Sequence, residues 1–275
     1  MNDEIHGKPS GFFSSVYGAL VTPDRAFTRE RQFTASRFLL FLLIFVLVFS
    51  GSVLTQRFNR NETMIALSTE EAVRRIEKSM ANAPREQREA AIERVVQSQD
   101  LKQVRVMLVA GLVFSSAVWA LFVLEIWFLS IILMQFLGGE EQPIGEKKHR
   151  RSLYLALYAI IPLALQALVR GIVYYFKDPA DISSALSLSE YMEAAEVSFS
   201  LLGLVHAGGL AGFAKYAAQN LTNPFCLWTL AVAYFGGRSV FGISRIKMLI
   251  AVAVVFVLVG LQNTLFAMIP NMFGG

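Results

Sequence analysis

Two ionisable side chains stand within stretches that are otherwise apolar, and they are the first candidates for chemistry. Glu125 is the only charged residue in positions 106–139, and Arg170 lies in a second apolar stretch. An ionised side chain at the centre of a membrane helix costs about 2.5–3.5 kcal/mol, so Glu125 should be protonated or paired. It could serve an ion or proton relay or contact a polar substrate. A structural hydrogen bond is favoured, because no second acidic residue accompanies it.

Arg170 is the partner to test for Glu125. Counting about 1.5 Å per residue from Leu137 and Ser152 places Glu125 roughly 18 Å and Arg170 roughly 27 Å from the same side of the membrane. Tilt and long side chains could close a difference of about 9 Å, and Arg170 could equally extend its charge outward beside Tyr174. An ion pair and an outward-pointing Arg170 therefore both stay open.

The other residue types that carry chemistry form no catalytic pattern. His6, His149 and His206 are scattered, and the single Cys226 cannot form an internal disulfide. No neighbouring ligand accompanies His206, which favours a hydrogen-bonded core histidine over a metal site. The motifs of nucleotide-binding loops, zinc proteases, serine hydrolases and dithiol redox sites are absent from the sequence. We therefore expect no enzyme activity, no cofactor and no bound metal.

The composition indicates which elements must hold these residues. Charged residues make up 17% of the 275 positions and apolar residues 55%, whereas a typical soluble domain has about 25% charged residues. Apolar runs of about 18 residues or more match the roughly 30 Å hydrocarbon core of a bilayer. Five such runs are predicted, at residues 38–56, 105–137, 152–176, 224–243 and 245–269. The predicted fold class is all-α, a polytopic helical membrane protein.

The segment before the first span and the segment after it are both expected to be helical. Residues 1–37 form a basic tail with an amphipathic stripe suited to a membrane surface, and Thr22-Pro23-Asp24 is typical of a helix start. Residues 57–104 mix charges of both signs and predict a helical hairpin broken near Asn82-Ala83-Pro84. A capping box is expected at residues 68–71, and weak apolar stripes should pair the two helices. The stripes are Val73, Ile76, Met80, Ile92, Val95 and Val96.

Two further loops separate the remaining spans. Residues 138–151 form a basic loop, and residues 177–223 form a loop with an interfacial or re-entrant helix at Val197–Ala214. Counting Lys and Arg on each side predicts a cytoplasmic N-terminus and an outside C-terminus, with the hairpin and the 177–223 loop outside. The net charge of +4 therefore reflects topology, and no nucleic-acid partner is expected. Cations near the last turn are candidates for lipid-headgroup contacts: Arg238, Arg245 and Lys247.

Short motifs near both ends of the chain resemble those of the Yip family, in its bacterial branch. The tail carries the segment Tyr17–Phe27, and Asn223-Pro224-Phe225 opens the fourth span, which ends in a Gly-rich turn before the basic Lys247. The matching motif residues are Pro23, Pro224, Phe225, Trp228, Gly236 and Gly237. The resemblance implies five spans, location in a bacterial cytoplasmic membrane and an unassigned biochemical role. Eukaryotic relatives associate with Rab-type GTPases, but this chain lacks their Asp-Leu-Tyr-Gly-Pro element, so Rab binding is not carried over.

Two functional hypotheses follow from the sequence. The leading one is a non-enzymatic, Yip-like membrane scaffold of trafficking type, which contacts lipids and could bind protein partners through the tail or the 57–104 hairpin, or form a homo-oligomer. The alternative is a small transporter or channel built around Glu125 and the Gly-rich segment 203–212. One acidic residue and one arginine at a different depth are fewer ionisable groups than a polar pathway usually needs, so binding is favoured.

Overall fold

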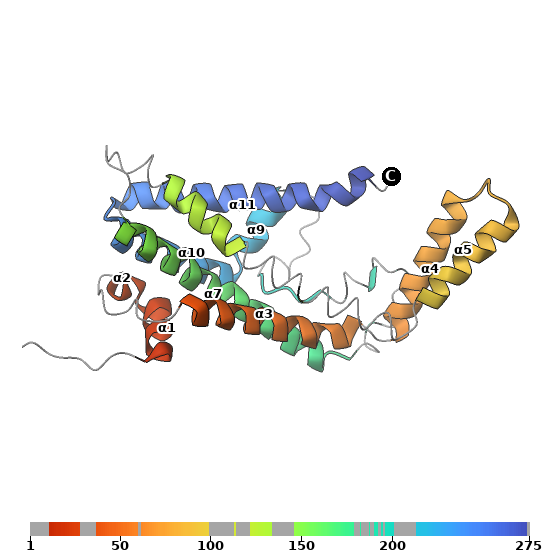
Figure 1. The fold of residues 1–275 in the computed structure, drawn as a ribbon, viewed down its shortest axis with the longest axis horizontal. Helices are drawn as coiled ribbons and strands as arrows, with labels where there is room; N and C mark the ends of the chain where they lie inside the picture. Colours follow the sequence, from red (N-terminus) through yellow and green to blue (C-terminus); the bar gives the residue numbers. More distant parts are fainter. Residues whose placement is uncertain are drawn as a thin grey trace, which may run out of the picture. The chain divides into compact units, whose positions relative to one another are not determined.

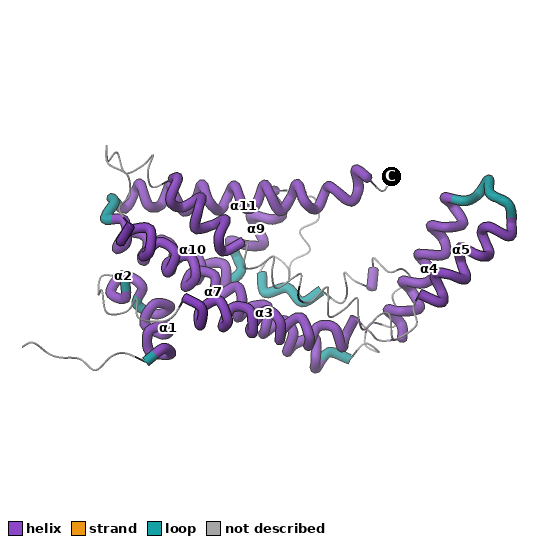
Figure 2. Tube along the Cα trace, in the orientation of Figure 1, coloured by secondary structure: helices purple, strands orange, loops and turns teal. Residues whose placement is uncertain are grey.

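The computed structural model describes the chain in separate segments, shown in Figure 1. The described residues are 11–27, 37–59, 62–98, 113, 122–133, 146–178, 182, 187, 190–191, 194, 196–200 and 213–273. Within them the regular structure is helical, with loops between the helices (Figure 2). The all-α prediction is therefore confirmed for this part of the chain.

The helix bounds show where the sequence patterns took effect. The N-terminal and hairpin helices are α1 (Phe12–Val21), α2 (Pro23–Ala26), α3 (Arg37–Asn59), α4 (Glu62–Ser79) and α5 (Arg85–Ser98). The later helices are α7 (Glu146–Phe176), α9 (Phe213–Leu221), α10 (Pro224–Phe241) and α11 (Arg245–Phe273), with a further helix at Phe122–Leu133. The helix start at Pro23 and the break before Arg85 lie where the sequence predicts them.

Two helices are long and apolar enough to cross a membrane among the residues that the structure describes. They are Arg37–Gln56 within α3 and His149–Phe176 within α7, and they contain the predicted spans 38–56 and 152–176. Helix α10 coincides with the predicted segment 224–243 to within two residues, and α11 includes all of 245–269. The complete set of five spans is a proposal, taken up below.

Three local predictions are wrong. Helix α4 runs through the expected capping box, and the Ser68 and Thr69 hydroxyls donate to the Ile65 carbonyl at 2.9 and 2.7 Å, as side chains within a helix do. Helix α7 starts at Glu146, so the end of the predicted basic loop is helical. Residues 197–200 are not helical, so the helix expected at Val197–Ala214 does not start at Val197, and residues 201–212 of that segment lie outside the described residues.

The chain divides into two compact units. Unit 1 comprises residues 1–46, 119–166 and 198–275, and unit 2 comprises residues 47–118 and 167–197. In unit 1 the centre is the first half of α7, where positions 154–162 are all buried, Pro162 included. A helix buried on every side must be covered by its neighbours, and the inner face of α10 supplies Val232, Gly236 and Val240 to this core.

In unit 2, α3 and α7 cross at two glycines. A Cβ atom at Gly51 would overlap the carbonyl of Ala167, and a Cβ atom at Gly171 would overlap the carbonyl of Gly51. The helix backbones therefore touch, which only small residues permit. Near the end of α3, Phe58 packs on Tyr174 and Tyr191 at ring distances of 5.1 and 6.1 Å.

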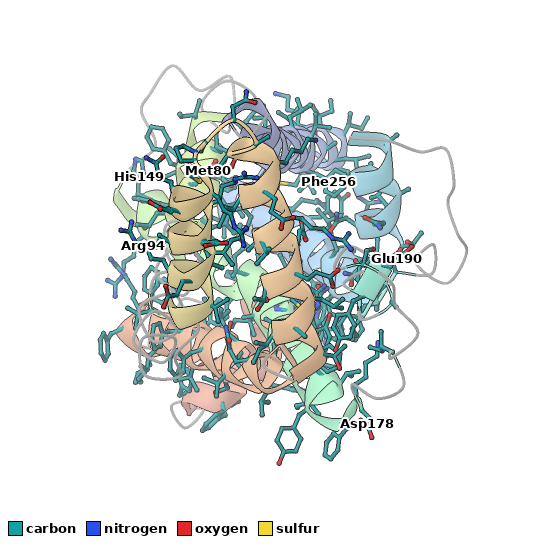
Figure 3. All side chains as sticks on the ribbon, turned by 90° about the vertical axis from the view of Figure 1, so that its right-hand side faces the viewer. Met80, Arg94, His149, Asp178, Glu190 and Phe256 are labelled. Carbon is teal, nitrogen blue, oxygen red and sulfur yellow. The ribbon has the colours of Figure 1, made fainter. Side chains whose placement is uncertain are left out.

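The hairpin of α4 and α5 also belongs to unit 2. Its two helices pack side by side, with Met80 beside the turn and Arg94 on α5 (Figure 3). Most members of the predicted stripes are half-buried, but Val96 is 53% exposed and does not join the seam. The outer faces carry i,i+4 ion pairs of the predicted kind, Arg74–Glu70, Arg75–Glu71 and Arg85–Glu89.

Candidate functional site

The motif residues at the start of α10 build the end of that helix. The Asn223 side chain accepts a hydrogen bond from the Phe225 backbone N–H at 3.0 Å, and Pro224 occupies the first helical turn. This is the arrangement that satisfies a free N–H at a helix N-terminus. The Phe225 ring packs edge-on against Phe199 at 5.5 Å. Asn223, Pro224 and Phe225 thus have a structural role.

One turn later, α10 holds the N-terminal tail. The Trp228 indole Nε1–H donates to the backbone carbonyl of Leu20, at the end of α1, at 2.9 Å. Three turns further along, the Ser239 hydroxyl donates to the carbonyl of Asp24 in α2, also at 2.9 Å. A half-buried indole N–H needs an acceptor, and here the tail backbone supplies it. Two hydrogen bonds therefore fix the tail along α10.

After Asp24 the tail inserts an aromatic side chain against Gly236, which lies between Trp228 and Ser239 on α10. Phe27 is buried and meets Tyr158 of α7 edge-on, with ring centroids 5.7 Å apart. A Cβ atom at Gly236 would lie 2.9 Å from the Phe27 ring and 2.6 Å from Cδ1 of Leu155, so glycine is what lets these side chains reach α10. We call this set of contacts the tail clamp. It consists of Leu20, Asp24 and Phe27 with Trp228, Gly236 and Ser239.

The second motif glycine sets the packing of the last helix. A Cβ atom at Gly237 would overlap the side chain of Met248 in the first turn of α11. Gly242 then ends α10 with φ +68°, a conformation that L side chains rarely adopt. The Gly-rich turn predicted at the end of the fourth span is therefore present. It brings the end of α10 and the start of α11 together.

The same contacts gather the starts of three helices at one end of unit 1. The Arg37 guanidinium, at the start of α3, lies 5.6 Å from the centre of the Tyr154 ring in α7. Leu155, the next residue, faces both Gly236 and Gly237 near the end of α10. In Figure 1 the starts of α3, α7 and α11 lie toward the left, where α10 ends.

We call this the basic end. Its cations are Arg25, Arg37, Arg150, Arg151, Arg238, Arg245 and Lys247. The three cations predicted to contact lipid headgroups are therefore joined by four others.

Glu125 lies closer to this end than the sequence predicts. Two residues further along its helix, the Trp127 indole N–H donates to the Ser152 hydroxyl at 3.0 Å. Glu125 is therefore within about one helical turn of the start of the predicted third span, whereas counting from Leu137 gives roughly 18 Å. Its side chain is half-buried.

Arg170 has an exposed side chain and falls in unit 2, while Glu125 falls in unit 1. The ion pair between them stays a prediction. His206 and the Gly-rich segment 203–212 lie outside the described residues. Within the described part of the chain, no group of three or more His, Cys, Asp or Glu side chains could hold a metal ion.

A comparison with known protein families tests the family resemblance of the short motifs. A family model described as the Yip1 domain matches residues 17–266. The chain belongs to the Yip1 domain family. The matched region includes the tail clamp, the basic end, the first four predicted spans and most of the fifth. No curated protein and no solved structure matches the chain. With its apolar helices of spanning length, this Yip1 domain chain is a membrane protein.

Sequence reasoning found the motif residues but not what joins them. Trp228 and Leu20 are 208 positions apart, and no spacing rule connects them. It also singled out the Gly-rich segment 203–212 and passed over Gly51 and Gly171. The signal available was the small-residue pair Ala167 and Gly171, four positions apart on one helix face.

Proposed function

We propose that this Yip1 domain protein is a non-enzymatic membrane scaffold, which holds partner-binding segments at the ends of a packed helical bundle. The observation that carries the proposal is the use of the family motif residues. Trp228, Gly236 and Gly237 are engaged in holding the tail and α11 on α10, and none of them is left to line an open site. Because the family motif residues hold helices and the tail in place, they support a protein that positions its segments rather than one that catalyses a reaction.

We propose a five-span topology with the N-terminus in the cytoplasm of a bacterial cell and the C-terminus outside. The support is the basic end: α3, α7 and α11 start there and α10 ends there, as the first, third, fifth and fourth spans of such a topology would. Lys and Arg are enriched on cytoplasmic flanks. The proposed second span, 105–137, has its described helix at Phe122–Leu133.

The hairpin is the proposed docking surface for a protein partner outside the membrane. Its ion pairs are largely exposed, and exposed pairs contribute little to stability, so these charges remain available for recognition. A photo-crosslinking residue at Arg94 on the outer face of α5 should capture one reproducible partner in cells, either another protein or a second copy of the chain. The same probe at Arg170 is the matched control. Capture of nothing above this control would remove the hairpin from the proposal.

The second candidate function, transport through Glu125, has a direct test. Glu125→Gln keeps the side-chain volume and removes the charge. In proteoliposomes of the scaffold we expect no flux of protons or small ions above empty vesicles, for the wild type and the variant alike. A flux that the wild type supports and the correctly folded Glu125→Gln variant loses would replace the scaffold by a transporter.

A further inference from the structure

Two helix starts at the basic end, those of α3 and α11, carry charges that oppose the helix dipole. A helix N-terminus has a partial positive charge and normally attracts acidic residues. Helices α3 and α11 hold no acidic residue in their first turns and begin instead with Arg37 and Arg245. Helix α7 differs, because it begins with the acidic Glu146 before its cations. The inverted charges at the starts of α3 and α11 indicate that an anion outside the described part of the chain compensates them.

Few acidic side chains accompany these cations in the described part of unit 1. Among the side chains of unit 1 that the structure describes, the acidic ones are Asp24 and Glu125, against the seven cations of the basic end. Arg238 adds a second observation: its Nε–H is buried and has no hydrogen-bond partner among the described residues, while its guanidinium lies 6.0 Å from the centre of the Tyr234 ring. A buried donor of this kind is costly unless an acceptor reaches it.

Apolar side chains beside these cations identify the kind of anion. Phe38, next to Arg37, is 70% exposed, and Ile246, next to Arg245, is 72% exposed. On α1, Phe13 and Tyr17 are also exposed on one helix face, opposite the buried Ser15. A soluble phosphate would leave these groups in water. A lipid satisfies both sets, because its phosphate meets the cations and its acyl chains cover the apolar side chains.

We propose that the basic end is a binding site for the headgroup phosphate of an anionic phospholipid. Arg238, Arg245 and Lys247 hold the phosphate at the start of α11, and Arg37, on its Tyr154 platform, flanks it. The exposed face of α1 lies in the same leaflet, fixed there by the tail clamp. The inference rests on the proposed membrane topology only for naming the leaflet. The binding itself is independent of orientation.

Native mass spectrometry of the full-length protein released from micelles tests the site. The probes are dioleoyl phosphatidylglycerol and dioleoyl phosphatidylcholine at equal concentration. We expect preferential retention of phosphatidylglycerol, with an apparent affinity that falls as ionic strength rises. Near a membrane surface each cation contributes about 1 kcal/mol, so Arg238→Gln, Arg245→Gln and Lys247→Gln should each weaken binding about five-fold, and the triple variant should abolish the preference.

Matched controls separate this site from general attraction of cations to lipid. Arg170→Gln, in the second half of α7, should leave the lipid preference unchanged, and Arg245→Lys should retain it. Circular dichroism must show native helix content for each variant. The proposal is overturned if the folded triple variant keeps the preference for phosphatidylglycerol, or if Arg170→Gln weakens phosphatidylglycerol binding as much as the triple variant does. It is also overturned if inorganic phosphate, at about 10-fold molar excess over lipid, displaces phosphatidylglycerol, because a site for free phosphate would behave in this way. None of these outcomes depends on whether the hairpin binds a partner.

Discussion

Trp228 shows why this position of the family motif carries a large aromatic ring with a polar edge. Its ring lies on α10, and its N–H reaches the carbonyl of Leu20, which has no further helical partner because α1 ends at Val21. Gly236 complements it by leaving room for Phe27. The two residues act on one segment of the tail, so their roles should be coupled.

Trp228→Phe tests this hydrogen bond, because it keeps most of the ring and removes the N–H. We expect the loss of about 1 kcal/mol of tail docking, which corresponds to roughly five-fold faster amide exchange in residues 12–27. Hydrogen exchange measured by mass spectrometry on the full-length protein checks it. Trp127→Phe removes an indole hydrogen bond to Ser152 instead and should leave exchange in the tail unchanged. Equal effects of the two variants would contradict the tail clamp.

The space around three glycines shows which helix contacts can adapt to an added side chain. At Gly51 an added Cβ would overlap the backbone of α7, whereas at Gly236 it would meet the ends of side chains that can shift. Gly11 has open space around it. The crossing of α3 and α7 is therefore the least adaptable contact of the three, because a helix backbone cannot rotate away as a side chain does.

Alanine at these three positions should give a graded loss of stability. Gly51→Ala should destabilise the protein by about 1–3 kcal/mol or more, since overpacking forces backbone to move. Gly236→Ala should have a smaller effect, because the side chains that its Cβ would meet can shift, while the gain in helix propensity of about 1 kcal/mol is the same at both positions. Gly11→Ala should change stability by less than about 0.5 kcal/mol. Reversible unfolding in mixed micelles measures the order, and Gly11→Ala matching Gly51→Ala would refute it.

At the scale of the whole molecule, the basic end decides the expected orientation. Lys and Arg near helix ends stay on the cytoplasmic side, and unit 1 gathers its described cations at one end. The hairpin, whose charges nearly balance, follows the first span in sequence and is therefore expected on the other side. A folded hairpin that holds charges of both signs follows the positive-inside rule poorly. The orientation is therefore inferred from the cations of unit 1.

Cysteine labelling in cells tests the orientation. On a Cys226→Ala background, Asn82→Cys places a thiol in the exposed turn of the hairpin, and Ser244→Cys places one between α10 and α11. A membrane-impermeant maleimide should label Asn82→Cys in cells with a permeabilised outer envelope. It should label Ser244→Cys only in inverted vesicles. The opposite pattern would reverse the topology, and labelling of both from one side would exclude it.

The sequence by itself determined the helical class, the apolar segments and the motif positions. Runs such as 38–56 and 152–176 are fixed by solvation of side chains, which is a local property, and Pro23, Pro224 and Gly242 act on their own backbone. Helix starts were less predictable, since α4 continues through residues that favour a cap and α7 begins in a basic segment. There, helix propagation outweighed the local preference for a turn.

Only the tertiary structure decided what the motifs do. Trp228 with Leu20, Gly236 with Phe27, and Gly51 with Ala167 are contacts between segments distant in the chain. Periodicity cannot reveal them, because it gives the face of a helix but not the neighbour that covers it. The same applies to the depth of Glu125, which follows from the contact between Trp127 and Ser152. Solvation selects the helices, and close packing between particular side chains selects their arrangement.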